Sequence, residues 1–173
     1  MFPKNIKLED VRESIKGRNE FREMVTKDHI VFTYFLGQSE DDNMFPDPST
    51  APDERTEYLW KVRRECRGIV FNKDTEKIIS RRFHKFFNIG ELPETSIEKI
   101  DFNRNYFLLV KLDGSMIAPF FTEGKLRYAT KQTVTDTSLL VEEFVKKSGI
   151  NFDDFCTNWI EKGYSPIFEW CSR

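Results

Sequence analysis

Five charged side chains occur where a chain normally carries uncharged ones, inside apolar stretches or beside tight turns. Arg67 lies in ECRGIVF, Lys85 in HKFFN, Lys111 in VKLDG and Glu169 in IFEW, and Lys131 ends the stretch LRYATK. Burying a charge costs free energy unless it is paired or used, so strand interiors normally exclude such groups. Several cations with one carboxylate predict a pocket for a ligand that has both phosphates and hydroxyls.

The stretch VKLDGSM, residues 110–116, allows two interpretations. Lys111 could be the last exposed residue before a plain hairpin turn. Alternatively, a strand and a tight turn could hold it as a nucleophile. Asp113 and Gly114 would then form the turn, and glycine would permit both a close backbone approach and a positive φ.

Composition and charge fit one globular domain with a substantial core. The chain has 173 residues, of which 39% are hydrophobic and 32% are charged, and its net charge is −2. Acidic residues gather in 38–57 and basic ones in 61–67. The basic cluster could bind a polyanion or could be a solvated face.

The cysteines and the N-terminus bear on the compartment. Cys66, Cys156 and Cys171 are odd in number and widely spaced, which predicts a reducing compartment without a disulfide framework. The N-terminal residues lack the apolar region of a signal peptide, and no apolar run is long enough to span a bilayer. We therefore expect a cytoplasmic or nucleoplasmic protein that does not enter a membrane. Its oligomeric state is open.

Hydrophobic periodicity predicts helices at both ends of the chain. Apolar residues at helical spacing predict one or two helices in an N-terminal segment, 1–28. Residues 38–57, in which prolines alternate with acids, predict a flexible acidic loop. Further helices are expected at 138–147 and 152–162. Their predicted apolar faces are Leu140, Val141, Phe144 and Val145 in the first, and Phe155, Trp159 and Ile160 in the second.

Short β-rich stretches separated by turns fill the rest of the chain. Strands are predicted at 29–37, 67–71, 77–81, 107–111, 115–121, 126–130 and 166–170. The LDG turn would join 107–111 to 115–121, and Glu123-Gly124 would form a further hairpin turn. The pattern predicts an α+β fold of largely antiparallel sheets with packed helices.

The motifs together resemble a known family. KxDG alone is a weak signal, but ECRGIVF, HKFFNIGE, KLDG, ATK and FEW occur in this order over residues 30–173. That ordered set resembles the ATP-dependent RNA ligases of the phage RNA-repair type, within the covalent nucleotidyltransferase superfamily. The resemblance implies the N-terminal part of a nucleotidyltransferase (ligase adenylation) domain. It also implies ATP and a divalent metal, magnesium or manganese, as cofactors and RNA ends as partners.

The resemblance also implies a reaction. Lys111 would attack the α-phosphate of ATP, displace pyrophosphate and hold AMP through a phosphoramidate bond. The AMP would then activate a 5′-phosphate for sealing to a 3′-hydroxyl of RNA. An amine is nucleophilic only when neutral, so neighbouring cations and burial would have to disfavour its ammonium form.

The same resemblance suggests roles for the remaining candidates. Lys85 and Lys131 match family lysines near the phosphates, and Phe87 matches an aromatic that stacks on adenine; in a chain with 17 phenylalanines, a core role for Phe87 is equally open. Arg67 would bridge ribose or phosphate, or instead pair with Glu65.

Two further candidates have both a ligand role and a structural alternative. Glu169 would accept hydrogen bonds from ribose hydroxyls, or form a buried salt bridge with one of the cations. Ser115 could donate to a phosphate or face solvent. Lys131 could instead be a surface lysine.

Family members continue beyond FEW with motifs that contribute to metal binding and contact the α-phosphate. This sequence ends at Arg173. We therefore expect a C-terminally incomplete domain that is weak or inactive alone, because those groups act on the transition state. Two alternatives remain, a non-catalytic module that binds nucleotides or RNA ends and a capping-type guanylyltransferase.

Overall fold

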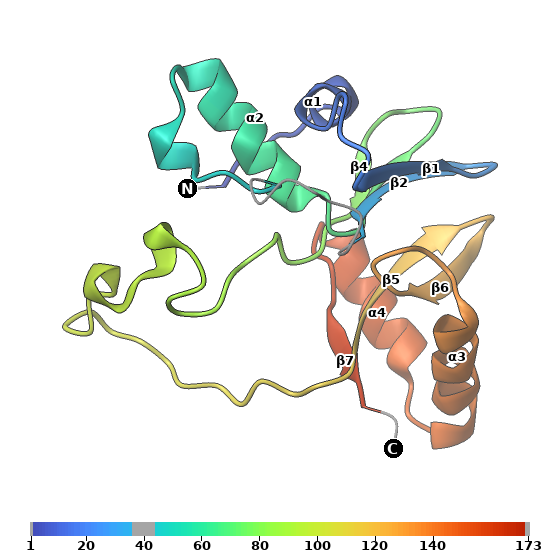
Figure 1. Cartoon of the computed structure of the whole chain (residues 1–173). Helices are drawn as coiled ribbons and strands as arrows, with labels where there is room; N and C mark the ends of the chain where they lie inside the picture. The colour runs from blue at the N-terminus through green and yellow to red at the C-terminus, as the bar shows by residue number, and fades with distance from the viewer. Residues whose placement is uncertain (1, 36–43, 172–173) are drawn as a thin grey trace.

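The computed structural model describes residues 2–35 and 44–171, and it has an α+β architecture with two antiparallel sheets (Figure 1). Part of the predicted acidic loop, 38–43, lies outside the described residues. The order of helices and strands is α1 Leu8–Ser14, β1 Phe21–Val25, β2 His29–Tyr34, α2 Glu54–Glu65, β3 Ile69–Asn72, β4 Ile78–Ser80, β5 Ser115–Thr122, β6 Lys125–Ala129, α3 Asp136–Ser148, α4 Phe152–Glu161 and β7 Phe168–Trp170. Three short 3-10 helices are η1 Pro48–Thr50, η2 Pro93–Thr95 and η3 Ile97–Lys99.

The first sheet has the order β1-β2-β3-β4, and all neighbours are antiparallel. Alternate side chains of a strand face opposite sides of a sheet. Ile30, Phe32, Ile69 and Phe71 accordingly pack in one cluster with residues of α1 and α2, which lie side by side in Figure 1. Each of these four side chains is at most 4% exposed.

The second sheet has the order β6-β5-β7 and is covered by α3 and α4. Glu123 and Gly124 join β5 to β6 with positive φ values of 49° and 71°, as a two-residue hairpin turn requires. This turn, α3, α4 and β7 confirm the predictions for the C-terminal half. Val141 and Cys156 bring the two helices onto the core of this sheet.

The two sheets meet through an apolar cluster and a polar joint. Val31 and Val70 from the first sheet pack with Phe120 and Ala129 from the second. Beside them, Thr122 Oγ1 donates to Asp28 Oδ1 at 2.8 Å, linking the β1–β2 turn to the end of β5.

The N-terminal helical segment is shorter than predicted. Among residues 2–28, only Leu8–Ser14 forms a helix, and Phe21–Val25 is strand β1. Gly17 has a φ of 76°, which interrupts the helical path between them. Phe21 pairs with Tyr34 across the hairpin, and this pairing overrides the local helical periodicity.

Helix α2 was not predicted, and it replaces part of the expected loop. The loop prediction over 38–57 is wrong for its described end, where η1 and the first turn of α2 lie. Asp53 caps α2 by accepting a hydrogen bond from the N–H of Thr56 at 2.8 Å.

The predicted basic cluster, residues 61–67, has a partly structural role. Arg64 is buried and pairs with Glu94, and Lys61 pairs with Glu57.

The predicted strand at 107–111 is wrong. The connection from β4 to β5 swings out to one side of the molecule and returns at Ser115 (Figure 1). Phe107, Leu108, Leu109 and Val110 are 86–91% exposed. Within the described chain no strand pairs with this run, and without a partner β propensity alone does not make a strand.

The helix faces also differ in part from the prediction. Val141 is buried, but Leu140 and Phe144 are about half exposed, at 54% and 47%. In α4 the buried residue is Cys156, whereas Phe155 and Trp159 are exposed. None of the helices in the described ranges is long and apolar enough to cross a membrane.

Candidate functional site

A cleft of about 800 Å³ opens where the two sheets meet. It is bordered by the end of β2, the start of β5, the segment after β6, the first turn of α3 and β7. Its lining includes all but two of the residues predicted from the motifs. The lining residues are Tyr34, Arg67, Phe83, Phe86, Val110, Lys111, Leu112, Asp113, Gly114, Ser115, Met116, Thr130, Lys131, Gln132, Thr135, Thr137 and Glu169.

Arg67 reaches the cleft from the turn between α2 and β3. Its guanidinium carbon lies 4.9 Å from the centre of the Phe86 ring. Its Nη1 is buried and has no hydrogen-bond partner among the described residues. The alternative partner Glu65 instead accepts hydrogen bonds from Arg81, at 2.6 and 2.9 Å. Arg67 therefore keeps a donor for a ligand, since a buried donor without a partner is costly.

Lys131 stands beside Arg67 because Gly68 allows the two segments to touch. Gly68 has a φ of 95°, and a β-carbon there would lie 2.7 Å from the carbonyl oxygen of Lys131. The Lys131 amine lies 4.7 Å from the centre of the Tyr34 ring and 3.5 Å from the Tyr34 carbonyl oxygen. Burial, followed by the charge of Arg67, lowers the pKa of Lys131. Two cations held this close favour binding of a polyanion, which relieves their repulsion.

The segment 111–115 forms the opposite wall. Lys111, Asp113 and Gly114 are exposed, and Ser115 begins β5. A β-carbon on Gly114 would collide with the carbonyl oxygen of Trp170, which confirms the expected close backbone approach. Gly114 is not among the glycines with a positive φ, so that part of the prediction is wrong. Because residues 107–111 form no strand, neither the plain hairpin nor the strand that was expected to hold Lys111 is present.

Glu169 reaches the cleft because of strand alternation. It pairs with Met116 across β5 and β7, while its neighbours Phe168 and Trp170 pack into the core of the second sheet. Glu169 is exposed and forms no ion pair among the described residues. The alternative of a buried salt bridge is therefore wrong, and the carboxylate is available to a ligand.

Lys85 and Phe87 lie outside the lining. The Lys85 amine donates to the carbonyl oxygen of Phe86 at 2.9 Å and lies 3.6 Å from Glu91 Oε1. The Phe87 ring packs on Phe45 at 6.2 Å and also contacts the amine of Lys85 at 4.1 Å. Their predicted ligand roles gain no support from this placement, and Phe86 is the neighbouring aromatic that lines the cleft.

Sequence reasoning missed several lining residues. Phe86 carried a usable signal, because it stands within the motif HKFFNIGE, whereas Tyr34 lies in the stretch 29–37, which was predicted only as a strand. Thr135 is the N-cap of α3, and with Thr137 it brings the N-terminal end of this helix to the cleft. The N-terminus of a helix carries partial positive charge and so complements an anion.

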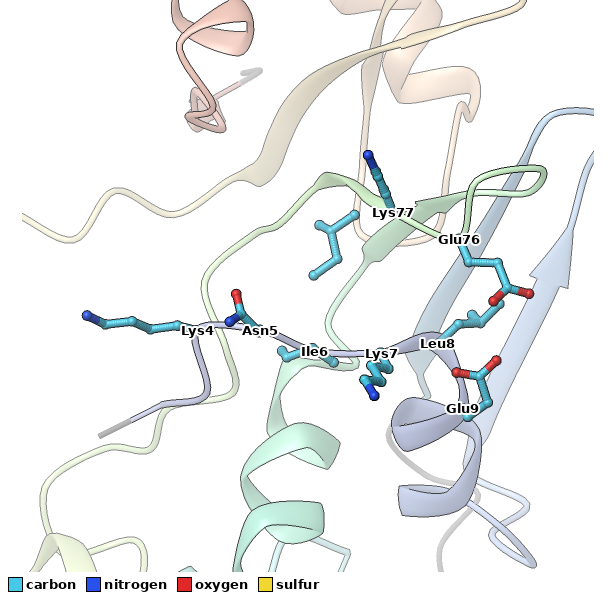
Figure 2. A pocket seen from close by; sticks show the side chains of 9 residues that line it. Lys4, Asn5, Ile6, Lys7, Leu8, Glu9, Glu76 and Lys77 are labelled. Atoms are coloured by element: carbon cyan, nitrogen blue, oxygen red, sulfur yellow. The ribbon is translucent and has the colours of Figure 1, made fainter.

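Two further features do not form a competing site. Among residues 2–35 and 44–171, no group of three or more His, Cys, Asp or Glu side chains could hold a metal ion. A second hollow of about 470 Å³ lies between the N-terminal segment and the β3–β4 turn (Figure 2). Its lysines Lys4, Lys7 and Lys77 point in different directions, so they do not converge on one ligand.

Comparison with known proteins identifies the family. The model of the RNA ligase family matches residues 65–173, which is well over half of the chain. A Thermovibrio ammonificans protein named "Putative RNA ligase" is 31% identical over 164 residues, covering 95% of this chain and 39% of the relative. "RNA ligase 1" of Bacteriophage TS2126 is 35% identical over 75 residues, or 41% of this chain and 19% of that protein.

A third relative is more distant. It is the "Putative bifunctional polynucleotide kinase/RNA ligase" of Autographa californica nuclear polyhedrosis virus, 25% identical over 126 residues and covering 63% of this chain and 18% of that protein. The chain thus spans about two-fifths or less of the length of these relatives. The family match over residues 65–173 shows that the chain belongs to the RNA ligase family.

Proposed function

We propose that the chain provides the nucleotide-binding cleft of an ATP-dependent RNA ligase that seals a 5′-phosphate to a 3′-hydroxyl of RNA. The observation that carries the proposal is the convergence of Arg67, Lys111, Lys131 and Glu169 on one cleft from four separate parts of the chain. Such a set combines a nucleophile, two phosphate-binding cations and a hydroxyl acceptor. If Lys111 were only an exposed lysine beside a turn, nothing would require Arg67, Lys131 and Glu169 to line the same cleft.

In the proposed first step, ATP lies in the cleft with its triphosphate towards Arg67 and Lys131. The neutral amine of Lys111 attacks the α-phosphorus, so that a P–N bond forms and the bond to pyrophosphate breaks. The lost amine proton passes to solvent, to which Lys111 is open. Arg67 and Lys131 stabilise the negative charge that grows on the leaving pyrophosphate.

The remaining residues would bind and orient the nucleoside. Glu169 accepts hydrogen bonds from the ribose hydroxyls, and Ser115 and the first turn of α3 face phosphate oxygens. Phe86 is better placed than Phe87 to stack on adenine because its ring is in the cleft. Magnesium would come with the phosphates of ATP.

A second function is favoured by one observation. Lys111 lies on an exposed segment that no described strand supports. A nucleophile must be held in line with the bond that breaks. A chain with this exposed segment would therefore bind ATP or an RNA end without turnover, as a binding module.

One experiment separates these functions. The purified chain is mixed with magnesium and α-labelled ATP or GTP without RNA, and protein-bound nucleotide is detected by gel and intact mass. Lys111→Ala is compared with Lys125→Ala, which removes an exposed lysine outside the cleft. An AMP adduct that only Lys111→Ala abolishes supports the ligase chemistry.

The other outcomes are equally informative. ATP binding without an adduct supports the binding module, and an adduct formed with GTP alone indicates a capping-type guanylyltransferase. Absence of both binding and adduct would overturn the proposed function. Sealing of labelled RNA ends by the same chain tests the expectation of weak or absent activity.

A further inference from the structure

Arg82 is a buried cation at the joint between the two sheets. It follows β4 and is 5% exposed. Its Nη1 donates to the carbonyl oxygen of Gly68, and its Nη2 donates to that of Ala129 at 3.4 Å. Among the described residues it forms no salt bridge, whereas the adjacent Arg81 pairs with Glu65. A buried guanidinium that binds only carbonyls is costly, so its retention calls for an explanation.

The two carbonyls belong to the segments that carry the cations of the cleft. Gly68 directly follows Arg67, and Ala129 lies two residues before Lys131. The side chain of Arg82 also packs here, because its Cδ would be 3.0 Å from a β-carbon on Gly68. The planar fork of a guanidinium can hold two acceptors at a fixed separation, which an ammonium group does less well.

Something must hold Arg67 and Lys131 together when no anion is bound. The charge of Arg67 is one of the causes that lower the pKa of Lys131, which shows that the two cations repel each other. Backbone hydrogen bonds do not link the 67–68 turn to the 130–131 segment in the described structure. Tyr34 contacts both cations, through a side-chain hydrogen bond with Arg67 and through its ring and carbonyl oxygen with Lys131. The Arg82 fork adds a direct polar connection between the two backbone segments, together with the close contact of Gly68.

We propose that Arg82 is a positioning residue that fixes the spacing of Arg67 and Lys131 and thereby sets the preference of the cleft for a polyphosphate chain. It does not touch the ligand. It acts by tying the Gly68 and Ala129 carbonyls to one rigid group. The polyphosphate part of this inference rests on the proposed function, and the positioning part does not.

The charge of Arg82 also contributes to the field in the cleft. Burial lowers the pKa of Arg82 to about 10, so the guanidinium remains protonated at neutral pH. A cation in surroundings of low dielectric acts over a longer distance than one in water. The positioning effect of Arg82 can be separated experimentally from the effect of its charge. Arg82→Lys keeps the positive charge but removes the planar guanidinium that binds two carbonyl oxygens.

The test uses Arg82→Met and Arg82→Lys, with Arg81→Met as the matched control. Arg81 is the preceding residue and its ion pair with Glu65 lies outside the cleft lining. Binding of ATP, inorganic tripolyphosphate and adenosine is measured by calorimetry, with the melting temperature of each variant. We expect Arg82→Met and Arg82→Lys to weaken ATP and tripolyphosphate binding about tenfold or more, as loss of a charged hydrogen bond does. Adenosine binding and the Arg81→Met variant should show little change in affinity.

A second readout needs no nucleotide. The rate at which an amine-specific reagent labels Lys131 is followed against pH by peptide mass analysis, with Lys162 as internal reference. If Arg82 positions Lys131, both Arg82 variants should shift the pH profile of Lys131 labelling to higher pH, because separation from Arg67 and loss of burial each remove a cause that lowers the pKa of Lys131. Lys162, whose amine lies over Trp159 at 5.3 Å, should not change.

Each result bears on one part of the inference. Unchanged Lys131 labelling in both Arg82 variants, or full recovery of ATP affinity by Arg82→Lys, would overturn the positioning role. If the unaltered chain binds neither ATP nor tripolyphosphate, the proposed function fails, and the labelling comparison still decides whether Arg82 positions Lys131. If Arg82→Met does not fold, Arg82→Lys provides the same comparison.

Discussion

Gly68 and Lys131 touch through their backbones, although 62 residues separate them in the chain. A β-carbon on Gly68 would stand 2.7 Å from the Lys131 carbonyl oxygen and 2.9 Å from its Cα. No side chain fits between the two sheets at this point. The contact places Arg67 next to Lys131, and both the stability of the fold and the affinity of the cleft depend on it.

Gly68→Ala is expected to destabilise the chain and to weaken ATP binding together. Alanine at a φ of 95° is strained by about 1–3 kcal/mol, and the methyl group also forces Lys131 away. Chemical denaturation and calorimetry measure the two effects. Gly163→Ala is the control, because Gly163 has a φ of 82° but nothing within 4 Å of the added methyl group. Equal losses in the two variants would contradict a role for the close contact.

Lys131→Met should reduce the rate of AMP-adduct formation by about a hundredfold, because it removes a donor that stabilises charge on the phosphates. If the unaltered chain forms no adduct, the affinity for ATP should fall instead. Lys162→Met removes another lysine that lies over an aromatic ring, at 5.3 Å from the Trp159 centre, but outside the cleft. It should leave nucleotide chemistry unchanged. Rates measured with saturating ATP distinguish lost catalysis from lost binding. Similar effects of the two substitutions would argue against the assigned phosphate role.

Asp28→Asn should alter the acid stability of the joint between the sheets. Burial opposes ionisation of Asp28, but hydrogen bonds from the N–H of Glu123, from His29 and from Thr122 outweigh it and lower its pKa to about 2. A carboxyl group with a depressed pKa stabilises the fold above its ordinary value near 3.8. That contribution is lost as the pH falls through about 2.

The measurement is the melting temperature between pH 2 and pH 7. The difference between the unaltered chain and Asp28→Asn should be constant above about pH 4 and shrink as the pH falls towards 2. Asp74→Asn, in the exposed β3–β4 turn, serves as the control and should follow the unaltered chain. A difference that does not change with pH would show that the ionised Asp28 is not what joins the sheets.

Two leucines test whether the exposed apolar run contributes to folding. Leu8 is 1% exposed and Leu108 is 91% exposed. Leu8→Ala should cost about 2–5 kcal/mol of unfolding free energy. Leu108→Ala should change it by no more than about 0.5 kcal/mol. Urea unfolding of both variants provides the comparison, and a large loss for Leu108→Ala would mean that the run is packed in solution.

Much of the C-terminal half was predictable because its signals are local. The Glu123-Gly124 turn, the cap before α3 and the alternation around Glu169 each act within a few residues. The ordered motifs then identified most of the cleft without a structure, and some of the motif residues stand at or just beyond the end of a strand. Lys131 after β6 and Ser115 at the start of β5 are examples.

The errors arose where partners distant in sequence decide the structure. Phe21–Val25 is a strand because β2 pairs with it, although its local pattern suited a helix. Helix α2 was missed because prolines and acids before it suggested a loop, while its cap, Asp53, and its terminal charges were the available signals. Phe86 could not be separated from Phe87, because residues 83–88 form no strand and alternation does not apply.

The order in which the cleft forms follows from the contact between Gly114 and Trp170. The segment 111–115, which carries Lys111, packs against the backbone of Trp170 only when β7 has paired with β5. This pairing joins residues more than fifty positions apart in the chain. Loop-closure entropy makes such long-range pairing slow compared with formation of α3 or of the β5–β6 hairpin. On refolding, helix and hairpin signals should therefore recover first, and the capacity to bind nucleotide should return in the slowest phase.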